Sequence, residues 1–149
     1  MKIRKMNFSL LTVMMVAFIV TFTSCKKEDD PKPQKETDEL TGSITSNKTL
    51  DPNVTYKLTG PLVVESGAEL NIPAGTVIKA TKSFNSYILV LQGGKINING
   101  TAEKPVTMTA DIPNAGSGHW GGLIINGSAP LAGGTTGSTE ISSAHLYGG

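Results

Sequence analysis

The feature that most constrains this chain is an internal repeat of a short, strand-like segment. Residues 62–72 align without a gap on residues 88–98, and both segments carry apolar side chains at the same alternating positions. Leu62 matches Ile88, and Leu70 matches Ile96. Alternating positions of a strand point to the same side of a sheet. One coil of such short strands cannot bury its apolar side, so the repeat predicts stacked coils that share a continuous core, as in a parallel β-helix.

Further matches extend the repeat. Val64 and Ile72 align on Val90 and Ile98, Gly67 on Gly93, and Asn71 on Asn97, while Val77 and Ile78 correspond to Val106 and Met108 after a longer turn. A third, looser unit begins at Trp120. Expected strands, separated by Gly, Pro and Asn turns, are 54–58, 62–65, 69–72, 76–80, 87–91, 95–98, 106–109 and 123–125.

These strands predict an all-β fold: a right-handed parallel β-helix of about three coils over residues 41–149. Stacked coils lie about 4.8 Å apart, which places Glu69 beside Lys95 and makes Asn71 and Asn97 either a side-chain ladder or two solvated residues. The alternative is a β-sandwich, an antiparallel fold with similar strand spacing. The identical register of the two repeat units favours the β-helix.

The N-terminus has the pattern of an export signal. Lys2, Arg4 and Lys5 precede an apolar run over residues 8–22, which is shorter than the roughly 20 apolar residues of a transmembrane helix. Residues 1–24 are therefore predicted to be a signal peptide that is removed. The chain's only cysteine, Cys25, follows directly and has no second cysteine for an intramolecular disulfide.

The residues before Cys25 resemble the lipobox of bacterial lipoprotein signals, although Phe22 stands where that motif usually has Leu. The resemblance implies cleavage between Ser24 and Cys25, and attachment of diacylglycerol and a fatty acyl chain such as palmitate to Cys25. Beyond this covalent lipid no cofactor is expected, and the lipid makes the membrane a partner. The alternative is an ordinary secretory signal with an incidental cysteine.

Residues 25–40 are predicted to form a disordered tether, because this segment is rich in charged residues of both signs and in proline, and has too few apolar side chains to form a core. The run Lys26-Lys27-Glu28-Asp29-Asp30 is similar to the export signal of surface lipoproteins in one group of Gram-negative bacteria. This similarity implies an outer-membrane lipid anchor with the protein on the cell surface, and the periplasmic face is the alternative. Without the signal peptide the chain has ten basic and twelve acidic residues and no basic stripe, so no nucleic-acid partner is expected.

Four segments together resemble the opening coils of large bacterial surface lipoproteins with right-handed parallel β-helix repeats. They are residues 50–60, 67–79, 100–106 and 120–125. The resemblance implies a surface-displayed β-helix. Members of that group are usually much longer, and this chain ends in the middle of the pattern at Tyr147-Gly148-Gly149, so we expect a C-terminally truncated chain or fragment.

The sequence offers little chemistry for a catalytic or metal site. No catalytic residue is assigned, because the acidic residues beyond the tether show no pairing typical of acid–base catalysis. His119 and His145 are separated by the same offset as the two repeat units but lack Cys or acidic partners, so no metal site is expected. The spacing Gly116-Ser-Gly-His-Trp-Gly121 spells a dinucleotide motif, yet an apolar strand follows it instead of a helix. Residues 133–138 are expected to be a flexible loop.

Trp120, the only tryptophan, is a candidate for stacking on a sugar ring, although packing as an anchor where the loop re-enters the coil is favoured. The sequence thus favours a non-enzymatic scaffold with a structural, adhesive or glycan-binding role. Its expected partners are membrane lipid, a surface polysaccharide or another cell-surface protein. The alternative is the N-terminal part of a carbohydrate-active enzyme, a polysaccharide lyase or glycoside hydrolase, with its catalytic coils beyond residue 149.

Overall fold

A computed structural model describes residues 36–149, which form eleven strands and no helix. The strands are β1 (Thr37–Ile44), β2 (Lys48–Thr49), β3 (Thr55–Val64), β4 (Glu69–Pro73), β5 (Val77–Ala80), β6 (Ser83–Val90), β7 (Lys95–Asn99), β8 (Thr107–Ala110), β9 (Trp120–Ile125), β10 (Gly137–Thr139) and β11 (Ser142–Tyr147). Within this part of the chain no helix is long and apolar enough to cross a membrane.

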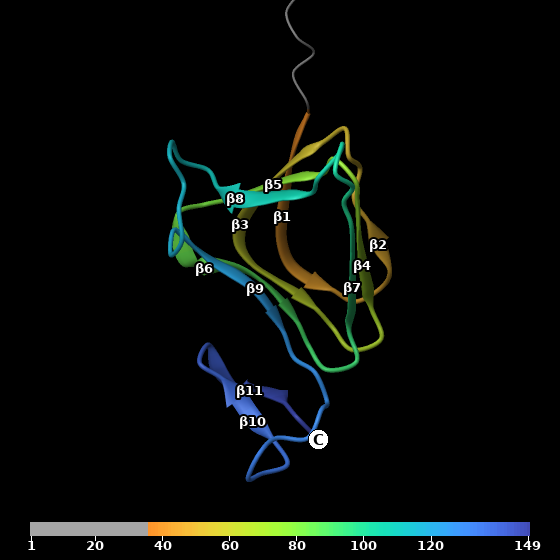
Figure 1. Ribbon diagram of the computed structural model, residues 1–149, viewed down its shortest axis with the longest axis vertical. Helices are drawn as coiled ribbons and strands as arrows, with labels where there is room; N and C mark the ends of the chain where they lie inside the picture. The colour runs from red at the N-terminus through yellow and green to blue at the C-terminus, as the bar shows by residue number, and fades with distance from the viewer. Residues whose placement is uncertain (1–35) are drawn as a thin grey trace, which may run out of the picture. The chain divides into compact units, whose positions relative to one another are not determined.

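The first nine strands wind into a parallel β-helix with three faces (Figure 1). Face 1 stacks the first half of β1, the first half of β3, β5 and β8. Face 2 stacks the second halves of β1 and β3 with β6 and β9. Face 3 stacks β2, β4 and β7. Within residues 36–149 this gives three full coils and a fourth that covers faces 1 and 2 only, in agreement with the expected number.

The strand register confirms the repeat seen in the sequence. Leu62 lies beside Ile88 on face 2, and Leu70 lies beside Ile96 on face 3, as the alignment predicts. Ile78 pairs with Met108 as expected. The predicted pairing of Val77 with Val106 is wrong, because Val77 pairs with Thr107. All pairings among β1 to β9 are parallel, which excludes the antiparallel β-sandwich.

The core is a set of apolar columns that run through the middle of the coil. Leu58, Leu70, Ile72 and Ile88 are each 0% exposed. Their register neighbours are apolar, except that Leu70 lies beside the exposed Lys48 of β2. At the C-terminal end of two faces inward side chains are open to solvent: Ile98 of β7, the last strand of face 3, is 44% exposed, and Ile125 of β9, the last strand of face 2, is 59% exposed. At these two positions the missing next coil leaves apolar area exposed, whereas Leu40 and Leu50 of the first coil are buried.

The β-helix begins earlier than the sequence predicts. β1 starts at Thr37, inside the predicted tether, and Leu40 is 1% exposed in the core. Only two of the eight residues of β1 are buried, Leu40 and Ile44, so the strand lacks an apolar run. The predicted signal peptide, the cleavage site at Ser24 and Cys25, and the rest of the tether lie outside the described residues.

A hairpin of β10 and β11 follows the coil. Of the flexible loop predicted over residues 133–138, residues 133–136 lie outside the strands and residues 137–138 begin β10. The hairpin is tied to face 2 through Asn126, whose side-chain amide donates to the carbonyl oxygen of Leu146 at 3.0 Å. Leu89 points outward from face 2, because its neighbours Ile88 and Val90 belong to the core, yet it is 0% exposed. We therefore place the hairpin over the outer side of face 2 (Figure 1).

Candidate functional site

The outer side of face 1 carries a column of polar side chains, one from each coil. The register stacks Glu39, Lys57, Lys79 and Thr109 in consecutive strands. The residues on either side of each position point into the coil, as expected from the alternation of side chains along a strand. Lys57 and Lys79 therefore lie on neighbouring strands about 4.8 Å apart and repel each other.

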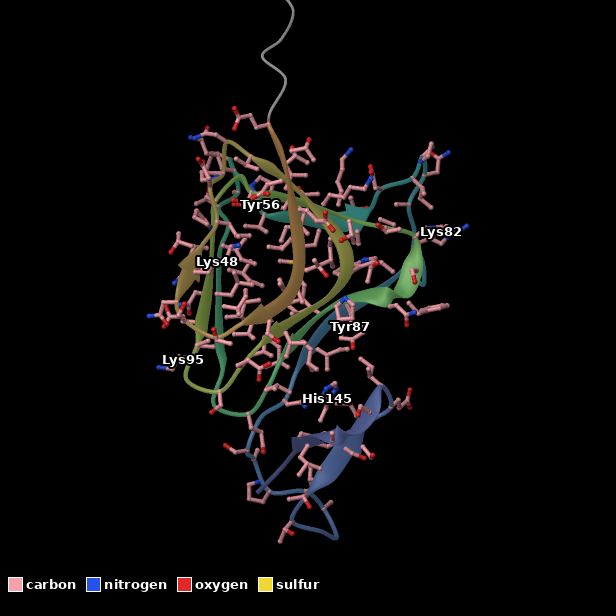
Figure 2. The ribbon with its side chains drawn as sticks, turned by 180° about the vertical axis from the view of Figure 1, so that it is seen from behind. Lys48, Tyr56, Lys82, Tyr87, Lys95 and His145 are labelled. Atoms are coloured by element: carbon pink, nitrogen blue, oxygen red, sulfur yellow. The ribbon has the colours of Figure 1, made fainter. Side chains whose placement is uncertain are left out.

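The corner between faces 1 and 2 lengthens from coil to coil. The residues that separate the two faces are Thr41 alone in the first coil, three residues (59–61) in the second, seven (81–87) in the third and twelve (111–122) in the fourth. The faces keep their register because the inward columns must match, so added residues collect at the corner. Figure 2 shows Lys82 projecting from this corner.

A cavity of about 570 Å³ lies where the polar column meets the longest corner. It is lined by Lys79, Thr109, Ala110, Asp111, Ile112, Pro113 and Ala115. Its volume falls in the range of small-molecule sites, roughly 300–1,000 Å³. The backbone amide of Asp111 donates to the carbonyl oxygen of Ala80 at 2.7 Å, which fixes the start of the corner against the coil below.

The charged groups of this cavity are available to a ligand. The Lys79 Nζ atom lies 3.3 Å from the Asp111 Oδ1 atom, and the side chains are 47% and 38% exposed. An ion pair this exposed is worth about 0–1 kcal/mol, so a ligand can replace it at small cost. Among the described residues Lys57 has no ion-pair partner, and the Glu39 carboxylate beside it in the register accepts a hydrogen bond from the Thr59 hydroxyl. An anionic group placed between the two lysines would relieve their repulsion.

Face 3 carries a polar ladder on its outer side. The Asn97 side-chain amide donates to the Asn71 Oδ1 atom and to the Glu69 Oε1 atom, both at 2.8 Å. Of the two alternatives for the asparagine pair, the structure shows the ladder. Lys95 lies beside Glu69 as predicted and points away from the coil (Figure 2). These bonds join neighbouring coils, which gives the ladder a structural role.

The structure separates the residues that the sequence singled out. Trp120 begins β9, is partly buried and packs against the core, which supports the anchor role over sugar stacking. The His119 Nδ1 atom accepts a hydrogen bond from the Gly116 backbone amide within its own turn, whereas His145 lies in β11 on the hairpin. The motif at residues 116–121 leads into β9 and not into a helix, as the sequence indicated. Within residues 36–149 no cluster of three or more His, Cys, Asp or Glu residues could hold a metal ion.

The lysine column and Phe84 were not among the candidate site residues predicted from the sequence. A signal for the lysines exists at a second, shorter offset, at which Lys57-Leu-Thr59 aligns on Lys79-Ala-Thr81. It is hidden because the coils differ in length, so no single offset aligns faces 1 and 2 together. Phe84 is 74% exposed at the widening corner, the most exposed of the large apolar side chains in the described part of the chain.

The three stacked faces make this protein a parallel β-helix, and the outer side of face 1 displays a column of polar side chains. The chain belongs to the pectate-lyase-like β-helix domain family, whose sequence profile matches residues 42–149. Comparison with curated proteins and with solved structures gives no match.

Proposed function

We propose that this chain is a lipid-anchored outer-membrane protein that displays its β-helix at the cell surface as a non-enzymatic, glycan-binding scaffold. The lipobox-like sequence before Cys25 and the polar segment after it support the anchor and the surface location. The stacked coils support the scaffold, because a solenoid presents long faces on which side chains repeat at a fixed spacing.

One observation carries the glycan-binding role: the lysine column of face 1 ends in a cavity lined by Lys79, Thr109 and Asp111. Paired ammonium groups suit a carboxylate or sulfate group, and the Thr hydroxyl and Asp carboxylate suit sugar hydroxyls. An acidic polysaccharide offers such groups at regular intervals, as the column offers its lysines. We therefore infer an acidic glycan as the ligand of face 1.

This inference is tested by measuring the binding of polygalacturonate to the full chain, by affinity electrophoresis or calorimetry. The double variant Lys57→Gln/Lys79→Gln should weaken binding at least about tenfold, because each charge-assisted hydrogen bond contributes roughly 1.5 kcal/mol or more. Wild-type binding should also weaken with added salt, since the column is exposed. Lys48→Gln/Lys95→Gln is the matched control, because it also removes two positive charges, both of them from face 3. Equal losses in both variants would reduce the effect to net charge and contradict a site on face 1.

The anchor has a separate test. Metabolic labelling with a fatty acid should mark the wild-type protein and not the Cys25→Ser variant. Protease treatment of intact cells should then degrade the β-helix if it lies outside the outer membrane. Persistent labelling of the variant would contradict lipid attachment at Cys25. Full protection from protease would indicate that the protein faces the periplasm.

Membership in the pectate-lyase-like family favours a second candidate, part of a carbohydrate-active enzyme with catalytic residues in further coils. Incubation with polygalacturonate distinguishes the two roles. Release of reducing ends would indicate hydrolysis or elimination, and release of unsaturated uronates would indicate a lyase. Binding without either product supports the scaffold.

A further inference from the structure

A second recess lies on the other side of the widening corner, at face 2. The corner segment 81–87 carries Phe84, whose side chain is 74% exposed. Gly121 of β9 lies directly against this segment: a Cβ atom there would sit 2.8 Å from the Tyr87 Cβ atom, closer than real contacts allow. Only glycine fits at this point of β9, because the backbone carbonyls of Phe84 and Ser86 and the Tyr87 side chain occupy the position that a Cβ atom would take.

The turn of the C-terminal hairpin forms the opposite wall. Together the corner, β9 and the turn border an open cleft of about 430 Å³, lined by Phe84, Gly121, Ile124, Thr139, Glu140 and Ile141. The lining combines one aromatic ring and two aliphatic side chains with one hydroxyl and one carboxylate. This volume also lies within the usual range for a small-molecule site.

The lining matches the two kinds of surface on a sugar ring. A pyranose has an apolar side formed by its C–H groups, which packs against an exposed aromatic ring, and an edge of hydroxyl groups. Those hydroxyls can donate to the Glu140 carboxylate and exchange hydrogen bonds with Thr139. Glu140 is the only charged residue that lines the cleft, so a uronate carboxylate would be repelled there. The cleft thus complements an uncharged sugar, whereas the lysine column complements an acidic one.

We propose that this cleft is a subsite for a neutral pyranose ring, with Phe84 as its stacking platform. The inference rests on the glycan-binding function proposed above and deepens it. The same corner segment, 111–122, begins at the lysine cavity with Asp111 and reaches the cleft at Gly121. A glycan that contains both acidic and neutral units can therefore contact both sites at one corner.

The experiment measures binding of the full chain to neutral gluco-, manno- and xylo-oligosaccharides and, in parallel, to polygalacturonate. Phe84→Ala should weaken binding of the preferred neutral probe roughly two- to tenfold, the loss expected for one aromatic contact. Phe84→Trp should retain it, because a flat ring remains. Ile98→Ala is the control, since Ile98 is also exposed, at 44%, but lies on face 3. Saturation-transfer NMR should show transfer to the C–H protons of the sugar ring with the wild-type protein, and less transfer with Phe84→Ala.

The outcomes separate this inference from the lysine site. Neutral-sugar binding that needs Phe84 and survives Lys57→Gln/Lys79→Gln supports the cleft, even if polygalacturonate does not bind. Polygalacturonate binding without any neutral-sugar binding overturns the cleft and leaves the function of face 1 intact. Neutral-sugar binding that Phe84→Ala leaves unchanged also overturns it. Because Phe84 is mostly exposed, the variants should keep the wild-type circular dichroism spectrum.

Discussion

The stacking of coils makes a quantitative prediction about two isoleucines in one column. Ile72 and Ile98 are register partners on face 3, with the same side chain and the same inward direction. Ile72 is 0% exposed between neighbouring coils, whereas Ile98 is 44% exposed in the last strand of its face. The substitutions Ile72→Ala and Ile98→Ala therefore remove the same atoms from different surroundings.

The expected losses follow from burial. Replacing a buried Ile by Ala removes three carbon atoms, which is about 2.4 kcal/mol of transfer free energy at roughly 0.8 kcal/mol each. The closed cavity left at Ile72 adds to this, for a total within about 2–5 kcal/mol. Ile98 keeps a little over half of its surface buried and leaves no closed cavity, so its loss should be about 1 kcal/mol. The predicted difference is at least roughly 1 kcal/mol, against a total stability of about 5–15 kcal/mol for a domain of ordinary size.

Urea denaturation followed by the fluorescence of Trp120 and by circular dichroism measures both losses on one scale. The two variants should share the wild-type dependence on urea concentration, so that the shift in midpoint reports stability alone. Equal losses would contradict the exposure of Ile98, because they would show that this side chain is covered in solution, for example by a second copy of the chain. A larger loss at Ile98 would contradict the assigned register itself.

Three further predictions concern contacts outside the core. Asn97→Ala should lower the free energy of unfolding by about 1 kcal/mol, because it removes two exposed hydrogen bonds between coils, and urea denaturation measures this. Gly93 has a φ of +80°, and a Cβ atom there would meet Ser66, so Gly93→Ala should lower the free energy of unfolding by at least about 1 kcal/mol. Adding Ser66→Ala to this variant should restore only part of the loss, because it removes the side-chain contact and leaves the backbone strain. Asn126→Ala should loosen the hairpin without unfolding the coil, because it removes the hydrogen bond to Leu146. Hydrogen exchange of the β10 and β11 amides should then become faster relative to that of β4. Unchanged exchange in the hairpin would show that this hydrogen bond does not hold it.

The sequence predicts the parts of the fold in which coil length is constant. Between the second and third coils faces 2 and 3 share one offset, so a gapless alignment finds Leu62 beside Ile88 and Asn71 beside Asn97. Between the third and fourth coils two corners are longer than their counterparts. Residues 100–106 take the place of residues 74–76, so that Val77 pairs with Thr107 and not with Val106, and residues 111–122 take the place of residues 81–87. The register of these strands depends on which residues form the corners. The alternation of apolar and polar side chains does not reveal where a corner begins and ends.

Two elements were missed for different physical reasons. β1 buries only Leu40 and Ile44, so most of the strand is held by backbone bonds to β3 and has the composition of a polar tether. The hairpin covers the outer side of face 2, and its own residues are mostly small and polar. The apolar surface that it covers, including Leu89, belongs to β6 and is indistinguishable in sequence from the inward residues beside it.

The location of both proposed sites follows from the same constraint. Every coil must present apolar side chains at matching heights, so a residue cannot be added within a face without moving a column out of register. A corner tolerates such additions, as the register shift between Ser83 and Tyr87 shows, and the corner between faces 1 and 2 grows from Thr41 alone to residues 111–122. Added chain there displays Lys82 and Phe84 and forms the walls beside Lys79 and Gly121. A β-helix that gains a binding function by adding residues is therefore expected to gain it at a corner, next to whatever column of side chains the neighbouring face already offers.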